Sequence, residues 1–174
     1  YYSISERELS LTLMTTDGTD SLSEFTRLKK LKVTPYKAQV KDAIRTDIDE
    51  DVSDALKQEA ENVYSDCTDL EDISFVSLAP ALQKLDVSLC AVSDISCLEN
   101  MSLTELNISH TKVSDLTPLT DMDSIQVLYI EDIPAEDLSP LLEMKGLKKV
   151  TGDKKLETVA DALKDKGVEV IITE

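Results

Sequence analysis

One stretch of the chain, residues 81–142, repeats one residue pattern three times and limits what the protein can fold into. The copies read ALQKLDVSLCAVSDISCLENM, SLTELNISHTKVSDLTPLTDMD and SIQVLYIEDIPAEDLSPLL. Apolar residues recur in five columns at intervals of 21 and then 22 residues: Leu82, Leu103 and Ile125; Leu85, Leu106 and Leu128; Val87, Ile108 and Ile130; Ile95, Leu116 and Leu138; Leu98, Leu119 and Leu141. Five columns in one register are too many for chance, so each copy is one unit of a repeating fold.

The pattern L-x-x-L-x-L at a period in the low twenties is typical of a leucine-rich-repeat solenoid. Side chains alternate along a strand, so Leu85 and Val87 point to one face and Lys84, Asp86 and Ser88 to the other. No repeat can bury its apolar face alone, and stacking supplies the missing partner. We therefore predict an α/β solenoid with a parallel β-sheet on its concave face and short helices or 3₁₀ turns on its convex side.

The whole chain fits one such domain. At 174 residues it is long enough for one continuous core. We predict a single leucine-rich-repeat domain over 1–174. It divides into N-terminal repeats (1–34), a helical insertion or degenerate repeat (35–65), regular repeats (66–150) and a C-terminal helix-strand cap (151–174).

Both ends of the chain show elements of the same stack. Polar and apolar residues alternate over 8–13, and L-x-x-L-x-V follows over 28–33, so both segments are predicted strands. Near the C-terminus, apolar residues at helical spacing predict a helix over 156–166 that stops at Gly167. A last strand over 168–172 completes a unit able to cover the open end of the stack.

The segments that return from one strand to the next carry helix-start signals. Thr117-Pro118 and Ser139-Pro140 place a hydroxyl directly before proline. This order predicts a short helix with the hydroxyl as N-cap and proline at the first helical position. A column of aspartates precedes the same turns, at Asp72, Asp94, Asp115 and Asp137. A carboxylate ladder for a metal is the alternative interpretation, and we favour capping.

A second acidic pattern also invites a metal interpretation. Asp47, Asp49 and Asp51 have the spacing of a calcium loop, which also needs Gly at its sixth position and Glu at its twelfth. The chain has Val52 and Gln58 there, so we interpret the run as the acidic start of a helix. One histidine and three cysteines without a C-x-x-C pair give no zinc spacing. We predict no metal and no cofactor.

The nucleophilic and basic groups give no catalytic arrangement. His110 has Ser and Asp neighbours, but no local signature of a catalytic triad surrounds it, so we interpret it as a surface turn residue. We predict no catalytic residue and no enzyme activity. Cys90 directly follows a strand, where a small buried thiol fits. Cys67 lies 23 residues earlier. A disulfide between them stays open, and two free thiols are favoured.

The charge balance limits the partners. A formal net charge of -17 repels nucleic acid and anionic lipid, whose protein partners use Lys and Arg, and it favours a basic partner. No apolar run approaches the roughly 20 residues of a membrane span, so we predict no membrane insertion in this segment. The chain begins Tyr-Tyr rather than Met, from which we expect an upstream part to have been removed.

The solvent-facing positions of the repeated strands are the candidate binding site. They mix both charges with hydrogen-bonding groups, and Tyr129 beside Val127 is their one aromatic anchor, a residue type favoured at binding hot spots. The alternative is an ordinary solvated sheet surface. The predicted binding residues are Lys84, Asp86, Ser88, Glu105, Asn107, Ser109, Val127, Tyr129 and Glu131.

The returns resemble those of one known family. TKVSDLTPL at 111–119, with DIS at 94–96 and DLSPL at 137–141, is similar to the 22-residue leucine-rich repeats of bacterial internalin-like surface proteins. The resemblance covers residues 66–150. It implies a right-handed solenoid that binds protein ligands on its concave face, outside the cell. Cys90, Thr111 and Ile133 occupy positions where such repeats carry Asn, so no asparagine ladder is present.

We therefore predict a non-catalytic protein-binding module that binds its partner on the concave sheet face and belongs to an exported bacterial surface protein. Two alternatives stay open. The chain could be a structural spacer within a larger surface protein, or an intracellular regulatory subunit similar to phosphatase-binding repeat proteins. The identity of the protein ligand and the oligomeric state do not follow from the sequence.

Overall fold

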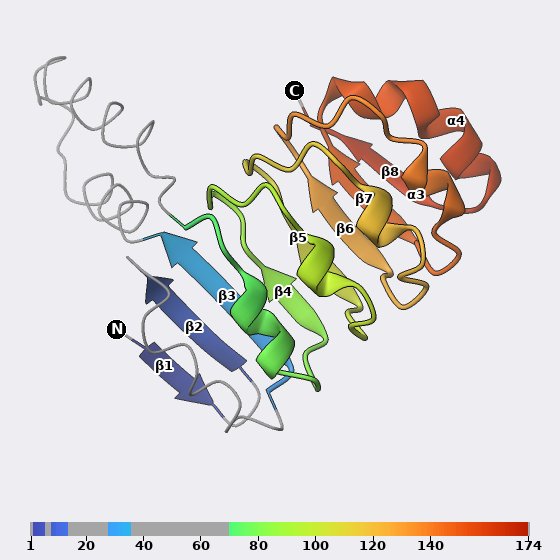
Figure 1. Ribbon diagram of the computed structural model, residues 1–174. Helices are drawn as coiled ribbons and strands as arrows, with labels where there is room; N and C mark the ends of the chain where they lie inside the picture. The colour runs from blue at the N-terminus through green and yellow to red at the C-terminus, as the bar shows by residue number, and fades with distance from the viewer. Residues whose placement is uncertain (1, 6–7, 14–27, 36–69, 174) are drawn as a thin grey trace, which may run out of the picture.

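The computed structural model describes residues 2–5, 8–13, 28–35 and 70–173, and these form one eight-stranded sheet in chain order (Figure 1). Each strand lies beside its neighbours in the sequence, as the repeats require. The strands are β1 (Tyr2–Ser5), β2 (Glu8–Leu13), β3 (Lys30–Pro35), β4 (Lys84–Asp86), β5 (Glu105–Asn107), β6 (Val127–Ile130), β7 (Lys149–Gly152) and β8 (Glu169–Ile172).

The strand register follows the apolar columns of the sequence. Parallel pairing joins each strand from β2 to β8 to the next. Leu85 lies opposite Leu106, and Leu106 lies opposite Leu128. Leu31 continues the same row beside Leu85. The predicted parallel sheet and its register are therefore confirmed from β2 to β8.

The returns cross to the other side of the sheet through single short helical turns. Figure 1 shows them stacked in a row in front of the strands. They are η2 (Ser74–Leu78), η3 (Ser96–Leu98), η4 (Thr117–Leu119) and α3 (Pro140–Glu143), the first three being 3₁₀ turns. This layer agrees with the predicted convex side, and none of the helices in the described residues lies on the opposite face of the sheet.

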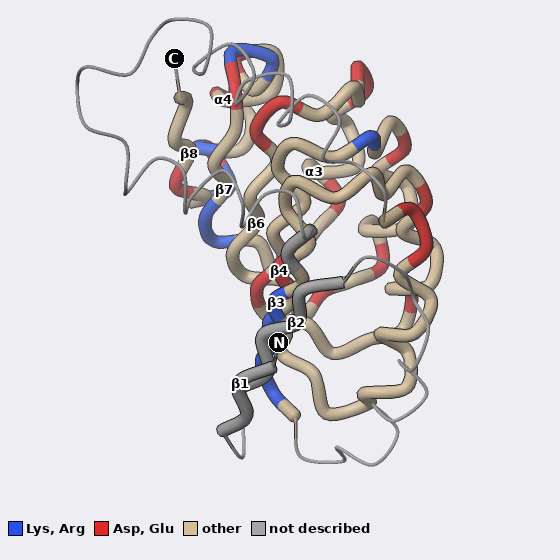
Figure 2. The backbone as a smooth tube through the Cα atoms, turned by 90° about the vertical axis from the view of Figure 1, so that its left-hand side faces the viewer, with Lys and Arg blue, Asp and Glu red and all other residues tan. Residues whose placement is uncertain are grey.

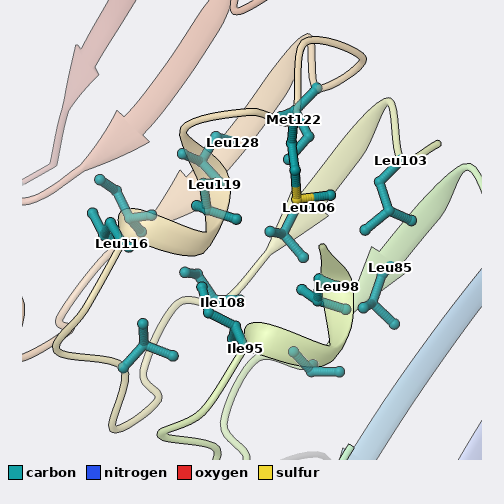
Figure 3. Close-up of a cluster of buried hydrophobic side chains, with 14 of the residues drawn as sticks. Leu85, Ile95, Leu98, Leu103, Leu106, Ile108, Leu116, Leu119, Met122 and Leu128 are labelled. Carbon is teal, nitrogen blue, oxygen red and sulfur yellow. The ribbon is translucent and has the colours of Figure 1, made fainter. Parts of the chain in front are cut away.

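The core fills the space between the strands and the returns. Leu106, Leu119 and Leu128 are fully buried, and each such side chain contributes about 1.5–3 kcal/mol by leaving water. Figure 3 shows side chains of neighbouring repeats pointing into this space: Leu85, Ile95, Leu98, Leu103, Leu106, Ile108, Leu116, Leu119, Met122 and Leu128. The columns are therefore explained by packing alone and carry no information about function.

The C-terminal end of the chain forms a helix-strand unit that packs on the last repeat. Asp153 caps η5 (Lys154–Leu156) by accepting a hydrogen bond from the N–H of Lys155 at 2.9 Å, and α4 (Glu157–Asp165) follows directly. Leu163 of α4 is fully buried against the core. Gly167 has φ of 81°, the left-handed conformation that lets a glycine end a helix.

Two features of the N-terminal half go beyond the sequence prediction. β1 is an edge strand that pairs antiparallel with β2, and no repeat pattern in the sequence predicts it. β3 pairs directly with β4, the next described strand along the chain. The predicted helical insertion, residues 35–65, lies outside the described residues except for Pro35.

The capping of the returns differs from the prediction in one respect. Proline stands in the first turn of η4 and α3, as expected. The hydroxyls are not the caps, however: the N-cap residue Ser139 makes no side-chain capping hydrogen bond, and the hydroxyl of Thr117 donates to Asp115. The aspartate is the capping group, because the Asp115 carboxylate accepts a hydrogen bond from the Thr117 N–H two residues ahead.

Candidate functional site

The sheet face turned away from the returns, here called the open sheet face, carries the predicted binding residues. The strand register places them in two rows that cross the sheet. Lys84, Glu105 and Val127 form the first row, and Asp86, Asn107 and Tyr129 form the second. The structure therefore brings together side chains that lie more than forty residues apart in the chain.

Charge is divided between the two sides of the molecule. Figure 2 shows acidic positions following the returns, with basic positions on β3 and beside β7. Asp94, Asp115 and Asp137 belong to the returns, whereas Lys32 and Lys149 belong to strands. The strands also carry carboxylates, so positive and negative side chains occur together on the open sheet face.

Neighbouring strands neutralise most of these charges in pairs. The Lys32 ammonium lies 3.1 Å from the Asp86 carboxylate, and that of Lys84 lies 2.5 Å from Glu105. On the opposite flank of the same face, the Lys149 ammonium lies 3.3 Å from the Glu169 carboxylate. The lysines retain between a third and a half of their side-chain exposure, so these pairs contribute little stability. Their effect is to neutralise both flanks of the face.

Between the flanks lie side chains without such partners. Val127, Tyr129 and Asn107 are partly exposed on β5 and β6. Asn107 Oδ1 accepts a hydrogen bond from the Ser109 N–H at 3.0 Å, while its NH₂ group has no partner among the described residues. The Tyr129 hydroxyl likewise makes no hydrogen bond within the described part of the chain. The centre of the face thus offers one aromatic ring, one aliphatic side chain and unused polar groups.

The last row of predicted residues serves the turns as much as the face. Ser88 donates its backbone N–H and its hydroxyl to Asp86 Oδ1, at 3.1 and 2.7 Å. Ser109 is only 3% exposed, and its Oγ accepts a hydrogen bond from the Glu131 N–H at 3.1 Å. Glu131 itself is partly exposed. The candidate binding surface therefore consists of the predicted residues other than Ser109.

Two members of this face were missed by the sequence comparison of the clear repeats. Glu169 pairs with Lys149, and Ile171 lies partly exposed opposite Thr151. Val150 and Val170 are register partners only 20 residues apart, because the helix α4 replaces the usual return. The strand over 168–172 was predicted, and the alternation of its residues is the signal that could have added Glu169 and Ile171 to the candidate binding residues.

The aspartate column of the returns is a capping ladder. Each carboxylate accepts a hydrogen bond from the N–H two residues ahead: Asp72 from Ser74 at 2.7 Å, Asp94 from Ser96 and Asp115 from Thr117 at 2.8 Å, and Asp137 from Ser139 at 2.9 Å. Hydrogen bonds to the backbone and hydroxyl two residues ahead hold the pKa of all four carboxyls below its ordinary value. The predicted capping role is confirmed. Among the described residues, no three His, Cys, Asp or Glu side chains form a group suited to a metal.

The histidine and cysteines occupy structural positions. His110 has φ of 57° in the turn after β5, and its Nδ1 lies 3.3 Å from Asp132 Oδ2 at the surface. Cys90 is a free, fully buried thiol whose pKa burial raises to about 12. Cys97 is free and partly buried, and burial raises its pKa to about 11. Cys67 lies outside the described residues.

No described helix of this chain has the length and apolar character needed to cross a membrane.

Comparison with known proteins shows the fold. No protein-family profile and no curated protein matches the chain. Among solved structures, it is similar to an internalin (inlF) of Listeria monocytogenes, with 21% identity and a TM-score of 0.50 over 83% of this chain and 38% of that one. An internalin C2 of the same organism matches with 16% identity and a TM-score of 0.48 over 95% of this chain and 80% of its own. The chain thus spans well under half of the first internalin, and its architecture is the leucine-rich-repeat solenoid.

Proposed function

We propose that this chain is a non-catalytic protein-binding module that contacts its partner through the open sheet face. The central contact surface consists of Asn107, Val127 and Tyr129, and the charged pairs on either side form its rim. Interfaces are commonly built in this way, with an aromatic anchor at the centre and near-neutral polar contacts around it.

The observation that carries the proposal is the contrast between the centre and the flanks of the face. Lysines on both flanks are already paired with carboxylates of the neighbouring strand. Tyr129 and the Asn107 NH₂ group have no such partner among the described residues. A tyrosine is not needed to build a solvated sheet surface, whereas a partner can bury its ring and satisfy both polar groups.

A place outside the cell is part of the same proposal. It is supported by the likeness to internalin structures, whose fold this chain shares. The structural spacer and the intracellular regulatory subunit are the competing functions. The spacer requires no contact at Tyr129, so loss of partner binding through that residue separates it from the module proposed here.

The test is a pull-down with the immobilised chain and its Tyr129→Ala, Asn107→Ala double variant. The double variant is expected to lose the captured partner while keeping the circular dichroism and melting curve of the wild type. The matched control is Glu99→Ala with Asp121→Ala, because both residues are exposed on the return side. Capture that survives the first pair of changes, or fails only with the second, would contradict the assignment to the open sheet face.

A further inference from the structure

The C-terminal edge of the sheet presents backbone groups that no described strand uses. β8 is the last strand of the sheet, and its neighbour among the described strands is β7 (Figure 1). The N–H groups of Glu169 and Thr173 donate to main-chain carbonyls on the β7 side, each at 2.8 Å. Hydrogen-bonding directions alternate along a strand, so the N–H and C=O groups of Val170 and Ile172 point to the outer edge. They are free to pair with a further strand.

The same edge leaves apolar side chains partly uncovered. Ile130, Gly152 and Ile172 are register partners in one row of the sheet. Ile130 is 3% exposed, whereas Ile172 at the end of the row is 37% exposed. Val170 packs on the core but is also partly exposed, and Ile171 is partly exposed on the open sheet face. Apolar surface therefore remains on both faces of β8, where a further strand would cover it.

The sequence of β8 lacks the residues that usually prevent edge strands from pairing. Residues 168–173 contain no lysine, arginine or proline, and lysine and proline are the residues that most often protect an edge. The one carboxylate in this segment belongs to Glu169, and it is neutralised by the Lys149 ammonium 3.3 Å away. An apolar edge without such protection favours association with another strand.

The charge distribution lets a second copy of the chain approach this end. Residues 145–174 contain seven lysines and six acidic residues, which gives a net charge of +1. Of the total charge of -17, residues 1–144 therefore carry -18. Like charge on residues 1–144 opposes contact between two copies, so they repel each other least where their C-terminal ends meet.

β8 is complementary to itself in the antiparallel direction. When Ile171 lies opposite Ile171 of a second copy, the outward groups of Val170 meet those of Ile172, and about four hydrogen bonds form. The side chains of Val170 and Ile172 then lie side by side, and Glu169 lies opposite Thr173. Pairing centred on Val170 would instead place the Glu169 carboxylate opposite Ile171. The register centred on Ile171 therefore matches apolar with apolar and polar with polar residues.

We propose that β8 pairs antiparallel with β8 of a second copy, centred on Ile171, and so joins two sheets across a twofold axis. The proposal concerns the edge of the sheet and is independent of the function proposed for the open sheet face. Residues that pair across the two strands share a face of the combined sheet, so both open sheet faces lie on the same side of the dimer. A dimer of this kind offers a partner two copies of the same surface.

Sedimentation equilibrium of the intact chain over a series of concentrations tests the dimer. We expect a reversible equilibrium between monomer and dimer. Ile172→Lys should weaken dimerisation about tenfold or more, because it replaces an apolar contact by a charge at the edge. Its circular dichroism should match the wild type, since the side chain is already 37% exposed.

The matched control is Leu78→Lys, because Leu78 is also 37% exposed and lies on η2. Both variants raise the net charge by the same amount, so a difference between them reports the position of the change. Leu78→Lys should dimerise like the wild type. A wild-type chain that stays monomeric, an equal effect of both variants, or assemblies larger than the dimer would overturn the proposal.

Ile171→Cys tests the register of the paired strands. Ile171 would form a pair without backbone hydrogen bonds, whose Cα atoms lie about 4.5 Å apart, within the range of a disulfide. Mild oxidation should therefore link two copies through position 171, as peptide mapping can show. Thr173→Cys is the matched control on the same strand and face, and it should link no copies, because position 173 lies opposite Glu169. A link at position 173 alone, equal links at both positions, or none at position 171 would refute the pairing.

Discussion

Replacing Leu106 by alanine should test the packing of the repeats most sharply. Leu106 is 0% exposed and lies between Leu85 and Leu128 in the central row of the core. Removing its side chain forfeits about 1.5–3 kcal/mol of burial. The cavity that remains raises the total loss to about 2–5 kcal/mol, because the strands on both sides prevent the site from collapsing. At a loss of about 3.5 kcal/mol, a chain of this length should melt about 7–14 °C lower.

The assay is urea unfolding followed by circular dichroism, with Leu78→Ala as the matched control. Leu78 is 37% exposed at the end of η2, so the same chemical change there should cost less than about 1 kcal/mol. The slope of the unfolding free energy against urea should stay unchanged in both variants. Equal losses in the two variants, or a loss below about 1 kcal/mol for Leu106→Ala, would refute the continuous core described above.

Three further predictions follow from the returns and the cap. Gly146→Ala should cost more than about 3 kcal/mol in urea unfolding, because the added Cβ would lie 1.8 Å from the Asp123 carbonyl oxygen. Gly167→Ala has no atom within 4 Å of its added Cβ, so it should cost only the strain of its positive φ, about 1–2 kcal/mol. Folding lowers the pKa of Asp115 below the ordinary value of 3.8. The stabilising contribution of its carboxylate is therefore complete above pH 3.8 and is lost as the pH falls through the lowered pKa. Acid titration of Asp115→Asn should therefore show a shallower loss of stability than wild type, and identical curves would speak against the capping ladder. Peptide mapping should find Cys90 labelled by iodoacetamide at pH 8 at least about a hundredfold more slowly in the folded chain than in urea, given a pKa of about 12; comparable rates would mean that the thiol is accessible.

The sheet could be predicted from the sequence because its core is a periodic object. A column such as Leu85, Leu106 and Leu128 states both the position of each strand and its register with the next. The short returns could be predicted equally well, since Asp stands at a fixed offset in each copy and Pro in the second and third. Local pattern and global packing agree in these repeats, which is why the strands β4 to β7 fall where the periodicity places them.

Elements without a periodic pattern could not be predicted in this way. β1 pairs with β2 in the antiparallel direction, and no second copy of its sequence exists for comparison. The sequence predicted caps from both the hydroxyls and the aspartates, and only the geometry excludes the hydroxyl, since Thr117 is itself the first residue of η4 and donates to Asp115. Propensity names the kinds of residue that cap a turn, and the backbone of the turn decides which one reaches the N–H.

The candidate site was partly legible for a related reason. The alternation of strand residues placed Asn107 and Tyr129 on the open sheet face, in neighbouring positions of one row. It also placed Ser109 there, which the structure buries, because the chain turns after Asn107 through the left-handed residue His110. Alternation holds along a strand and lapses where the strand ends.

The central claim is that the partner contacts the centre of the open sheet face, and site-specific photo-crosslinking tests it most directly. A benzophenone amino acid in place of Tyr129 should form a covalent adduct with the partner on irradiation. The same probe in place of Thr117, which is exposed on η4, should form none. An adduct at position 129 alone is the predicted result; an adduct at position 117 alone, or equal adducts at both positions, would contradict the account.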